Sequence, residues 1–510
     1  MNNKLLNWVF VGQLVLFGLV ITGVLPRETA LFLAGGLALY FLFASLEDAT
    51  VFFVRSIPFF LAIPITSTFD NFNVWRVLSV IIFLKWLWQV PDLKQKIKDY
   101  HRSHLSLILH GLVIFAILSI IPALDKILAV KRIIYFLNLS LIGFVIYDLA
   151  QQEWFAKRLI KNISIPVIAV ALVGFIQLIS TYFIDIYQFM RVWGEGIQCN
   201  QFGSQWCYIA VHVGNTWFAY YGEQLSLRMF SLFPDSHSFP QFLILGLPAI
   251  FAVALAGLIK EHHASLIKMV RTRSKLLIIS VPFIFLAAIL TGTRGIWAAS
   301  IGALIFAGFY IYLLERQKKY DHRRILIYIS SYLSLFFLLF AIAFPIFESP
   351  QFLLSKGDAL LFGKRLESIF DFGETSNGQR VAIWKASLVS IKSHPFLGIG
   401  IGNFPLVLKQ KLELAKAGSS AHNIYLHIAA EMGIPALILV LWFLWLLMQK
   451  IYSNFIFSKD WEILVYNGAA LIFIPWVLIY CLTDVALFDE RAFLLFVTTI
   501  SLILATKNPD

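Results

Sequence analysis

Four arginines stand in positions where a fixed positive charge needs an anionic partner. Arg294 lies in the short segment Thr291–Gly295 between two apolar runs, and Arg228, Arg365 and Arg380 lie in longer hydrophilic stretches. A guanidinium group is planar, permanently charged and forked, so it matches the oxygens of phosphate and pyrophosphate better than an ammonium group does. We expect Arg294 to bind an anionic lipid carrier, while a lipid headgroup or a nearby carboxylate is the alternative partner for each arginine.

His422 and Asn423 open a segment that leads into an apolar run. An imidazole can take a proton from a hydroxyl nucleophile, and the neighbouring amide could orient the ring or the substrate. One alternative is an interfacial histidine with a structural role, and another is a metal ligand together with His427 and Glu431. The two histidines are five residues apart instead of the four of a His-Glu-x-x-His helix, and no second cluster of ligands is near. We therefore expect neither a metal nor a cofactor.

Two further motifs have structural explanations. Gly398, Gly400 and Gly402 resemble a nucleotide-binding loop, but they follow no strand and no lysine completes a phosphate-binding pattern, so we expect a tight turn. Cys199 and Cys207 share one hydrophilic stretch. On an oxidising face of a membrane these two thiols would be candidates for a disulfide.

The elements that must position these residues are membrane-spanning helices. The 510-residue chain is 59% hydrophobic and 14% charged, whereas soluble domains contain roughly 25% charged residues. The long unbroken apolar runs also exclude an outer-membrane barrel. We predict an all-α polytopic membrane protein with about 12–14 transmembrane helices, because a helix needs roughly 20 apolar residues to cross a bilayer. The ranges are 5–24, 28–45, 49–66, 74–90, 105–124, 131–150, 163–184, 239–259, 276–292, 295–314, 326–346, 430–449, 463–482 and 491–506.

The basic residues assign the two sides of the membrane. With the N-terminus in the cytoplasm, the Lys/Arg clusters at 94–102, 157–161, 260–275 and 316–324 all fall on the cytoplasmic side, as the positive-inside rule requires. The net charge of +12 then reflects orientation, and we expect no nucleic-acid partner.

Two hydrophilic loops fall on the extracytoplasmic side and divide the chain into five parts. These are N-terminal transmembrane helices (1–184), a first extracytoplasmic loop (185–238), central transmembrane helices (239–346), a large extracytoplasmic loop (347–424) and C-terminal transmembrane helices (425–510). In the large loop, apolar residues recur at helical spacing and predict an amphipathic helix on the membrane surface. They are Val381, Ile383, Trp384, Leu388 and Ile391.

Taken in order, several motifs resemble the bacterial O-antigen ligase and O-antigen polymerase family. They lie within roughly residues 225–445 and comprise Leu290-Thr-Gly-Thr-Arg-Gly295, Arg380-x-x-x-Trp384, the segment from Ser393 to Phe404, His422-Asn-x-x-Leu426 and Glu431-x-Gly433. The resemblance implies a metal-independent, inverting glycosyltransferase of the bacterial inner membrane. It would move a glycan from undecaprenyl pyrophosphate to an acceptor hydroxyl, on lipid A core or another acceptor, at the extracytoplasmic face.

The resemblance also implies roles for individual residues. Arg228 and Arg294 would bind the pyrophosphate leaving group, Arg380 would support the donor site, and His422 would activate the acceptor. Arg365 and Asn423 are further candidates for substrate binding. Arg365 lies in the large extracytoplasmic loop, which the resemblance would make the catalytic loop.

One motif departs from the family pattern. After Arg228 the family usually shows a glycine three residues on and a Pro-Asn pair after the aspartate, where this chain has Ser231, Ser236 and His237. His237 is a candidate substrate contact, or a competitor to His422 as the base. The sequence leaves a ligase and a polymerase both open. A transporter is a third hypothesis, which we disfavour because the polar residues cluster at the outer interface instead of at the midplane of broken helices.

Overall fold

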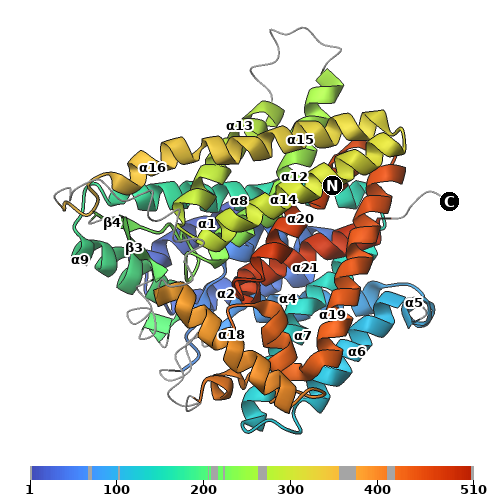
Figure 1. Cartoon of the computed structure of the whole chain (residues 1–510), viewed down its shortest axis with the longest axis horizontal. Helices are drawn as coiled ribbons and strands as arrows, with labels where there is room; N and C mark the ends of the chain where they lie inside the picture. Colours follow the sequence, from blue (N-terminus) through green and yellow to red (C-terminus); the bar gives the residue numbers. More distant parts are fainter. Residues whose placement is uncertain are drawn as a thin grey trace.

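The computed structural model covers the whole chain, and we describe residues 3–66, 72–101, 104–204, 206–207, 216–221, 224–261, 273–354, 375–409 and 420–506. Within these ranges the chain is almost entirely helical (Figure 1). Four short strands form two antiparallel hairpins, β1 (Ala62–Ile63) with β2 (Phe72–Asn73) and β3 (Phe218–Tyr221) with β4 (Gln224–Leu227). The prediction of an all-α polytopic membrane protein is confirmed.

Eight helical stretches in the described ranges are long and apolar enough to cross a membrane. They are α1 (Asn3–Ile21), α7 (Lys126–Leu149), α8 (Glu153–Ser180), α12 (Ser238–Glu261), α14 (Arg294–Arg316), α15 with α16 (Tyr320–Leu338 and Phe340–Glu348), α19 (Ile424–Phe457) and α20 (Trp461–Tyr480). Shorter helices in the predicted spans are α2 (Thr29–Phe43), α4 (Val74–Gln89), α6 (His104–Leu118), α13 (Arg273–Leu290) and α21 (Glu490–Ala505). The polar helix α5 (Leu93–His101) joins α4 to α6.

One predicted span, 49–66, is not a single helix. Helix α3 (Leu46–Ser56) ends before Pro58, a 3-10 turn η1 (Ile57–Phe59) follows, and the chain then extends through β1. Proline has no N–H to donate and its ring clashes with the preceding turn, so the helix does not continue through Pro58 and Pro64. The other thirteen predicted ranges coincide with helices.

Helices α12 and α20 form the centre of the bundle. In the Ser238–Leu255 part of α12 every side chain except the partly buried Val253 is buried, and nearly all of those in α20 are buried too. A helix that is apolar around its whole circumference and covered on all sides needs neighbours in every direction. Here α8, α13, α14, α19 and α21 surround the pair, as Figure 1 shows. Segments joined to α12 and α20 are therefore attached to the most deeply buried helices of the bundle.

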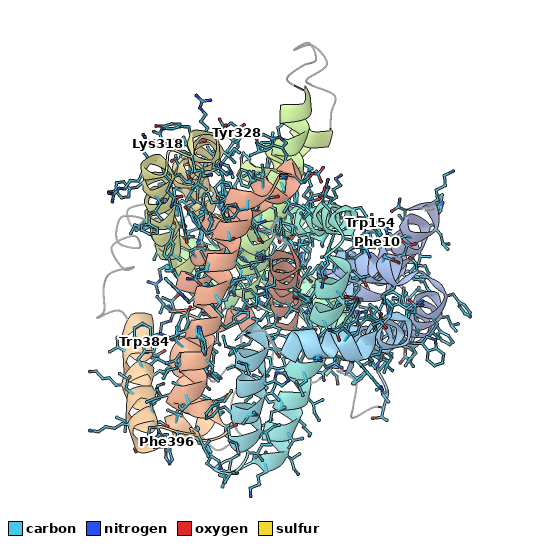
Figure 2. The ribbon with its side chains drawn as sticks, turned by 90° about the vertical axis from the view of Figure 1, so that its right-hand side faces the viewer. Phe10, Trp154, Lys318, Tyr328, Trp384 and Phe396 are labelled. Atoms are coloured by element: carbon cyan, nitrogen blue, oxygen red, sulfur yellow. A yellow bond between two sulfur atoms is a disulfide. The ribbon has the colours of Figure 1, made fainter. Side chains whose placement is uncertain are left out.

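The two ends of α20 distinguish the two ends of the bundle. Asp460 precedes α20 and pairs with Lys157, and Lys161 pairs with Glu462 in the first turn at 3.2 Å. At about 1.5 Å per residue, the 20 residues of α20 carry the chain about 30 Å to Tyr480. We call the end of the bundle near Asp460 and Lys157 the basic end, and the end near Tyr480 the site end. In Figure 2, Lys318 of the basic 316–324 cluster lies near the top, whereas Trp384 and Phe396 lie near the bottom.

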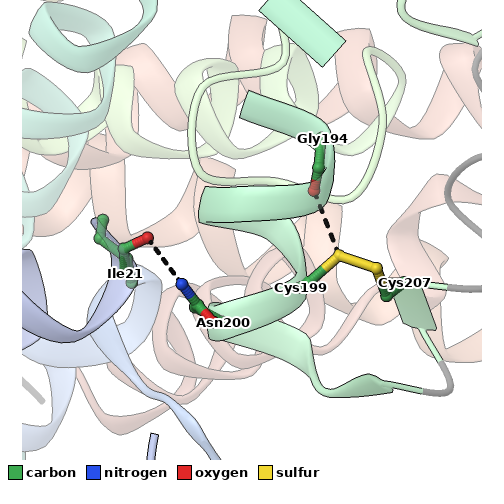
Figure 3. Close-up of a disulfide and its surroundings, with 5 residues drawn as sticks. All are labelled: Ile21, Gly194, Cys199, Asn200 and Cys207. Atoms are coloured by element: carbon green, nitrogen blue, oxygen red, sulfur yellow. Dashed lines mark hydrogen bonds between the residues drawn. A yellow bond between two sulfur atoms is a disulfide. The ribbon is translucent and has the colours of Figure 1, made fainter. Parts of the chain in front are cut away.

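The first hydrophilic loop is tied to α1 and to the site end. Helix α9 (Ile186–Phe189) continues into the π-helix η2 (Met190–Gln198) and then α10 (Cys199–Phe202). Cys199 and Cys207 form a disulfide, and Asn200 Nδ2 donates to the carbonyl of Ile21 at 3.2 Å (Figure 3). Gln198 Nε2 donates to the carbonyl of Phe233 at 3.0 Å, which fixes the segment that precedes α12.

Candidate active site

Arg228 opens an irregular segment that connects β4 to α12. Its Nε donates to the carbonyl of Thr291 at 3.1 Å, and its Nη2 lies 3.3 Å from Thr293 Oγ1. Thr293 Oγ1 in turn donates to the carbonyl of Ser236 at 2.8 Å. These bonds cross-link the segment around Arg228 to the turn between α13 and α14. The guanidinium is thus oriented by groups from two separate parts of the chain.

Arg294 is the first residue of α14 and follows a sharp turn. Gly292 has a φ of 62°, which side chains disfavour, and Gly295 lies against the end of α20. A Cβ atom at Gly295 would meet Thr483 Oγ1 at 2.4 Å and Tyr480 Cε2 at 2.9 Å. Glycine is needed here because α14 and α20 approach this closely at the site end.

Helix α18 (Thr375–Ser393) carries Arg380 and packs against the first turns of α19. Trp384 Nε1 donates to the carbonyl of Ala421 at 3.0 Å, directly before His422. Val381, Ile383, Trp384 and Ile391 are at least half-buried, but Leu388 is 55% exposed and does not share their face. The predicted helix is present, and its packed face excludes Leu388.

His422 adopts a φ of 45°, in the left-handed region that residues with a side chain rarely occupy. Asn423 follows in an extended conformation, and its side-chain oxygen accepts from Leu426 N at 3.0 Å, which caps α19. The unusual backbone at His422 therefore lies between a loop held by Trp384 and a helix start fixed by Asn423.

A buried clamp supports this junction from the other side. His427 Nε2 lies 3.4 Å from Glu431 Oε2, and the His427 ring stacks on Phe404 with 4.7 Å between centroids. Glu431 Oε1 accepts from Phe404 N at 3.0 Å, and His427 Nδ1 lies 3.4 Å from Ala421 N. The glycine turn from 398 to 404 and the residue before His422 are thus anchored to the same turn of α19.

Asp484 lies in the loop after α20 and faces both site histidines. Its Oδ1 accepts from the backbone N–H groups of Val485 and Ala486 at 2.8 and 2.9 Å. Its Oδ2 lies 3.1 Å from His237 Nδ1 and 3.8 Å from His422 Nδ1. Burial opposes ionisation of this carboxyl, but its interactions with the His237 ring, and then with the His422 ring, hold the pKa of Asp484 well below its ordinary value. Asp484 is therefore an anion between the two rings.

The hydrogen-bond network assigns the protons on His237. Its Nε2 lies 3.4 Å from Arg228 Nη2, and a guanidinium can only donate, so Nε2 accepts. Nδ1 then carries the proton and donates toward Asp484. For His422, Nδ1 faces the same carboxylate, which leaves Nε2 as the nitrogen with a lone pair for a bound hydroxyl.

These residues line one cavity of about 290 Å³ at the site end. Its walls come from the Arg228 segment, the α13–α14 turn, α18, the loop before α19 and the last residue of α20. The described residues that line it include no Asp or Glu, and they are Thr216, Arg228, His237, Gly292, Thr293, Arg294, Gly295, Gln379, Arg380, Ile383, His422 and Tyr480. Three guanidinium groups and two imidazoles in one small cavity favour a multivalent anion.

The structure brings together five of the residues that the sequence singled out. Arg228, His237, Arg294, Arg380 and His422 all line the cavity. Asn423 does not line it, because its side chain caps α19. Arg365 lies outside the described residues.

Two residues of the site carried no clear signal in the sequence. Asp484 follows an apolar run and resembles an ordinary polar residue at the end of a span, and Tyr480 lies within the run itself. Asp484 lies in a short loop between two spans, so it must stay close to the end of the bundle that holds the site. A carboxylate in such a position was the signal that could have identified it. Among the described residues, no three His, Cys, Asp or Glu side chains are arranged to hold a metal ion.

Comparison with protein families identifies the region that contains much of this cavity. Residues 279–441 match the family model described as O-Antigen ligase. This region of the chain is therefore similar to the O-antigen ligase family. The matched region includes Arg294, Arg380 and His422, whereas Arg228, His237 and Asp484 lie outside it. No curated protein and no solved structure matches the chain.

This match supports a general class of reaction. Together with the apolar helices, the match supports a multi-pass membrane enzyme of the glycan ligase and polymerase type, a class that uses lipid-linked glycan and acceptor substrates. The cavity joins the matched region to residues from α20 and from the segment before α12.

Proposed function

We propose that this protein transfers a glycan from undecaprenyl pyrophosphate to an acceptor hydroxyl, as the match of residues 279–441 to the O-antigen ligase family suggests. The observation that carries the proposal is the single cavity in which Arg228, Arg294 and Arg380 meet His422, with Asp484 behind it. Pyrophosphate brings several negative oxygens, and forked guanidinium groups bind such oxygens with directed hydrogen bonds. The glycan is already activated by its pyrophosphate linkage, so the reaction needs no nucleotide.

The proposed chemistry divides between the arginines and the histidine. The acceptor oxygen forms a bond to the anomeric carbon while the bond from that carbon to the pyrophosphate oxygen breaks, which inverts the anomeric centre. Negative charge grows on the leaving group, and Arg294 would stabilise it more in the transition state than in the ground state, while Arg228 would bind the pyrophosphate in both states. Arg380 approaches from α18 and would hold the donor. No step in this scheme requires a metal ion.

His422 would be the general base. Its Nε2 would accept the proton of the acceptor hydroxyl as the new bond forms, and the resulting imidazolium would be stabilised by Asp484 Oδ2, 3.8 Å from Nδ1. Asp484 would keep the proton on Nδ1, so that Nε2 presents its lone pair. The unusual φ at His422 supports this role, since a backbone outlier beside a cavity is a feature of functional sites.

The cavity would open to the extracytoplasmic side of the bacterial inner membrane. It lies at the site end, about one helix length from Lys157, Lys161 and their carboxylate partners. Basic clusters mark cytoplasmic ends of spans, so the opposite end would face outward.

The test is a reconstituted transfer reaction. The purified protein in nanodiscs would be incubated with an undecaprenyl-pyrophosphate oligosaccharide and a chelator, once with a lipid A core acceptor and once with donor alone. Product on the core acceptor supports a ligase, whereas a ladder from donor alone identifies a polymerase. No transfer and no release of undecaprenyl pyrophosphate in either arm would refute the proposal.

Three variants sharpen this test. His422→Ala should abolish transfer, while His394→Ala, which removes an exposed histidine of the same loop, should not. Arg294→Lys keeps the charge but removes the fork, so it should lose much of the activity. Full activity of the lysine variant would indicate that charge alone is required.

A further inference from the structure

We propose that His237 is a positioning residue that aims the Arg228 guanidinium into the cavity, and that it acts through Arg228 instead of on the acceptor. This inference rests on the proposed function of the cavity. It concerns the position at which this chain departs from the family pattern, where the sequence left His237 as either a substrate contact or a second base.

Both ring nitrogens of His237 are already engaged. Nδ1 lies 3.1 Å from Asp484 Oδ2 and 3.2 Å from the Tyr480 hydroxyl, and Nε2 lies 3.4 Å from Arg228 Nη2. A neutral imidazole has one donor and one acceptor, so these contacts use both. The ring is also less accessible than that of His422, with 19% of its side chain exposed against 36%. His237 therefore has no lone pair left for an acceptor hydroxyl.

The contacts on Arg228 fix the plane of its guanidinium. Thr291 accepts from Nε, and Thr293 Oγ1 and His237 Nε2 both lie within hydrogen-bonding distance of Nη2. Thr293 belongs to the α13–α14 turn, whereas His237 precedes α12. Hydrogen bonds that lie in the plane of a guanidinium group fix its orientation. The His237 ring makes one of the contacts that orient the Arg228 guanidinium.

His237 is itself held in place from two sides. Asp235 Oδ1 accepts from His237 N at 2.9 Å and from Ser238 N at 2.8 Å, which fixes the backbone at the start of α12. Asp484 holds the ring through Nδ1. The chain of contacts from Asp484 through His237 to Arg228 thus runs from the loop after α20 to the pyrophosphate side of the cavity, and it starts at the same oxygen, Oδ2, that faces His422.

Two substitutions separate the two bonds of the ring. His237→Asn places an amide N–H near the Nδ1 position, so it can keep the bond to Asp484 but cannot reach Arg228. His237→Gln places a carbonyl oxygen near the Nε2 position, so it can accept from Arg228 but loses Asp484. We expect His237→Asn to raise the donor KM about tenfold, the effect of roughly one hydrogen bond to a charged group, with kcat at saturating donor within about threefold. His237→Gln should remain within about threefold in both constants.

The experiment measures donor KM, kcat and equilibrium binding of undecaprenyl pyrophosphate without a glycan, for wild type and both variants, with thermal unfolding as the check on folding. A double-mutant cycle with Arg228→Ala completes it: if His237 acts through Arg228, neither substitution should have a further effect in that background. Additive losses, a fall in kcat with an unchanged donor KM, or equal losses in the Asn and Gln variants would each overturn the assignment.

The controls distinguish failure of this inference from failure of the proposed function. If the wild type neither binds undecaprenyl pyrophosphate nor transfers a glycan, the proposed function is wrong. If the wild type does both while the His237 variants do not follow the expected pattern, only the role of His237 is wrong.

Discussion

Replacement of Asp484 by Asn removes the charge that faces His422 and, because the same oxygen faces His237, also the acceptor for His237 Nδ1. The amide oxygen can still accept from Val485 N and Ala486 N, so the loop after α20 should keep its conformation. At 3.8 Å, a full charge pair is worth about 4 kcal/mol at an effective dielectric constant of about 20. Because the His422 side chain is 36% exposed, solvent screening reduces this to about 3 kcal/mol of stabilisation of the imidazolium. The kcat for glycan transfer should therefore fall about 100-fold.

The assay is single-turnover transfer at saturating donor, with unfolding temperature measured in parallel. The pKa of Asp484 is held well below its ordinary value by His237 and His422 against the effect of burial, so the carboxylate stays ionised throughout about pH 5 to 9. Asp460→Asn is the matched control, because Asp460 caps the opposite end of the same helix and pairs with Lys157. Wild-type kcat in a folded Asp484→Asn protein would refute the role of Asp484.

Three further predictions follow from contacts around the site. Trp384→Phe removes the donor to Ala421 O and should lower kcat about tenfold without changing the unfolding temperature by more than a few degrees; an unchanged kcat would contradict the role of this bond. Gly398→Ala would place a Cβ 2.3 Å from the Glu431 carbonyl carbon at a φ of 64°, so the yield of folded protein in size-exclusion chromatography should fall sharply, and a normal yield would contradict this packing. Burial raises the pKa of Asp489 to about 7, so its contribution to stability is present at low pH and lost as the pH rises through about 7; Asp489→Asn, which still caps α21, should flatten the pH dependence of thermal unfolding, and an unaltered profile would count against it.

The sequence predicted most helices because their signal is local. A run of about 20 apolar residues is enough by itself to form a helix across a bilayer, and the one predicted run that does not form a single helix contains Pro58 and Pro64. The sequence does not predict which face of a helix packs against its neighbours, because that depends on the position of other helices. Leu388 has the helical spacing of its neighbours, but its exposure depends on where α19 packs, which no local pattern encodes.

The site was predictable where chemistry and motif coincide. Arg294 and His422 stand in short segments with unusual residue types, so the sequence alone pointed to them. Asp484 lies 62 residues after His422 in the chain, and its role arises only from the packing of α20 against α12 and α14. Asn423 is next to His422 in the sequence but has no part in the cavity, because its side chain accepts a hydrogen bond from the backbone of α19.

The left-handed backbone at His422 lowers the stability of the fold, whereas the proposed transfer reaction needs the histidine side chain at this position. A non-glycine residue held in this region costs roughly 1 to 2 kcal/mol, and glycine would adopt the same conformation without that cost. Selection of random variants for heat resistance alone would therefore favour glycine at position 422, whereas selection for glycan transfer would retain histidine. A library sorted under the two pressures should diverge at this residue, and the thermostable survivors should include inactive proteins with an otherwise intact cavity.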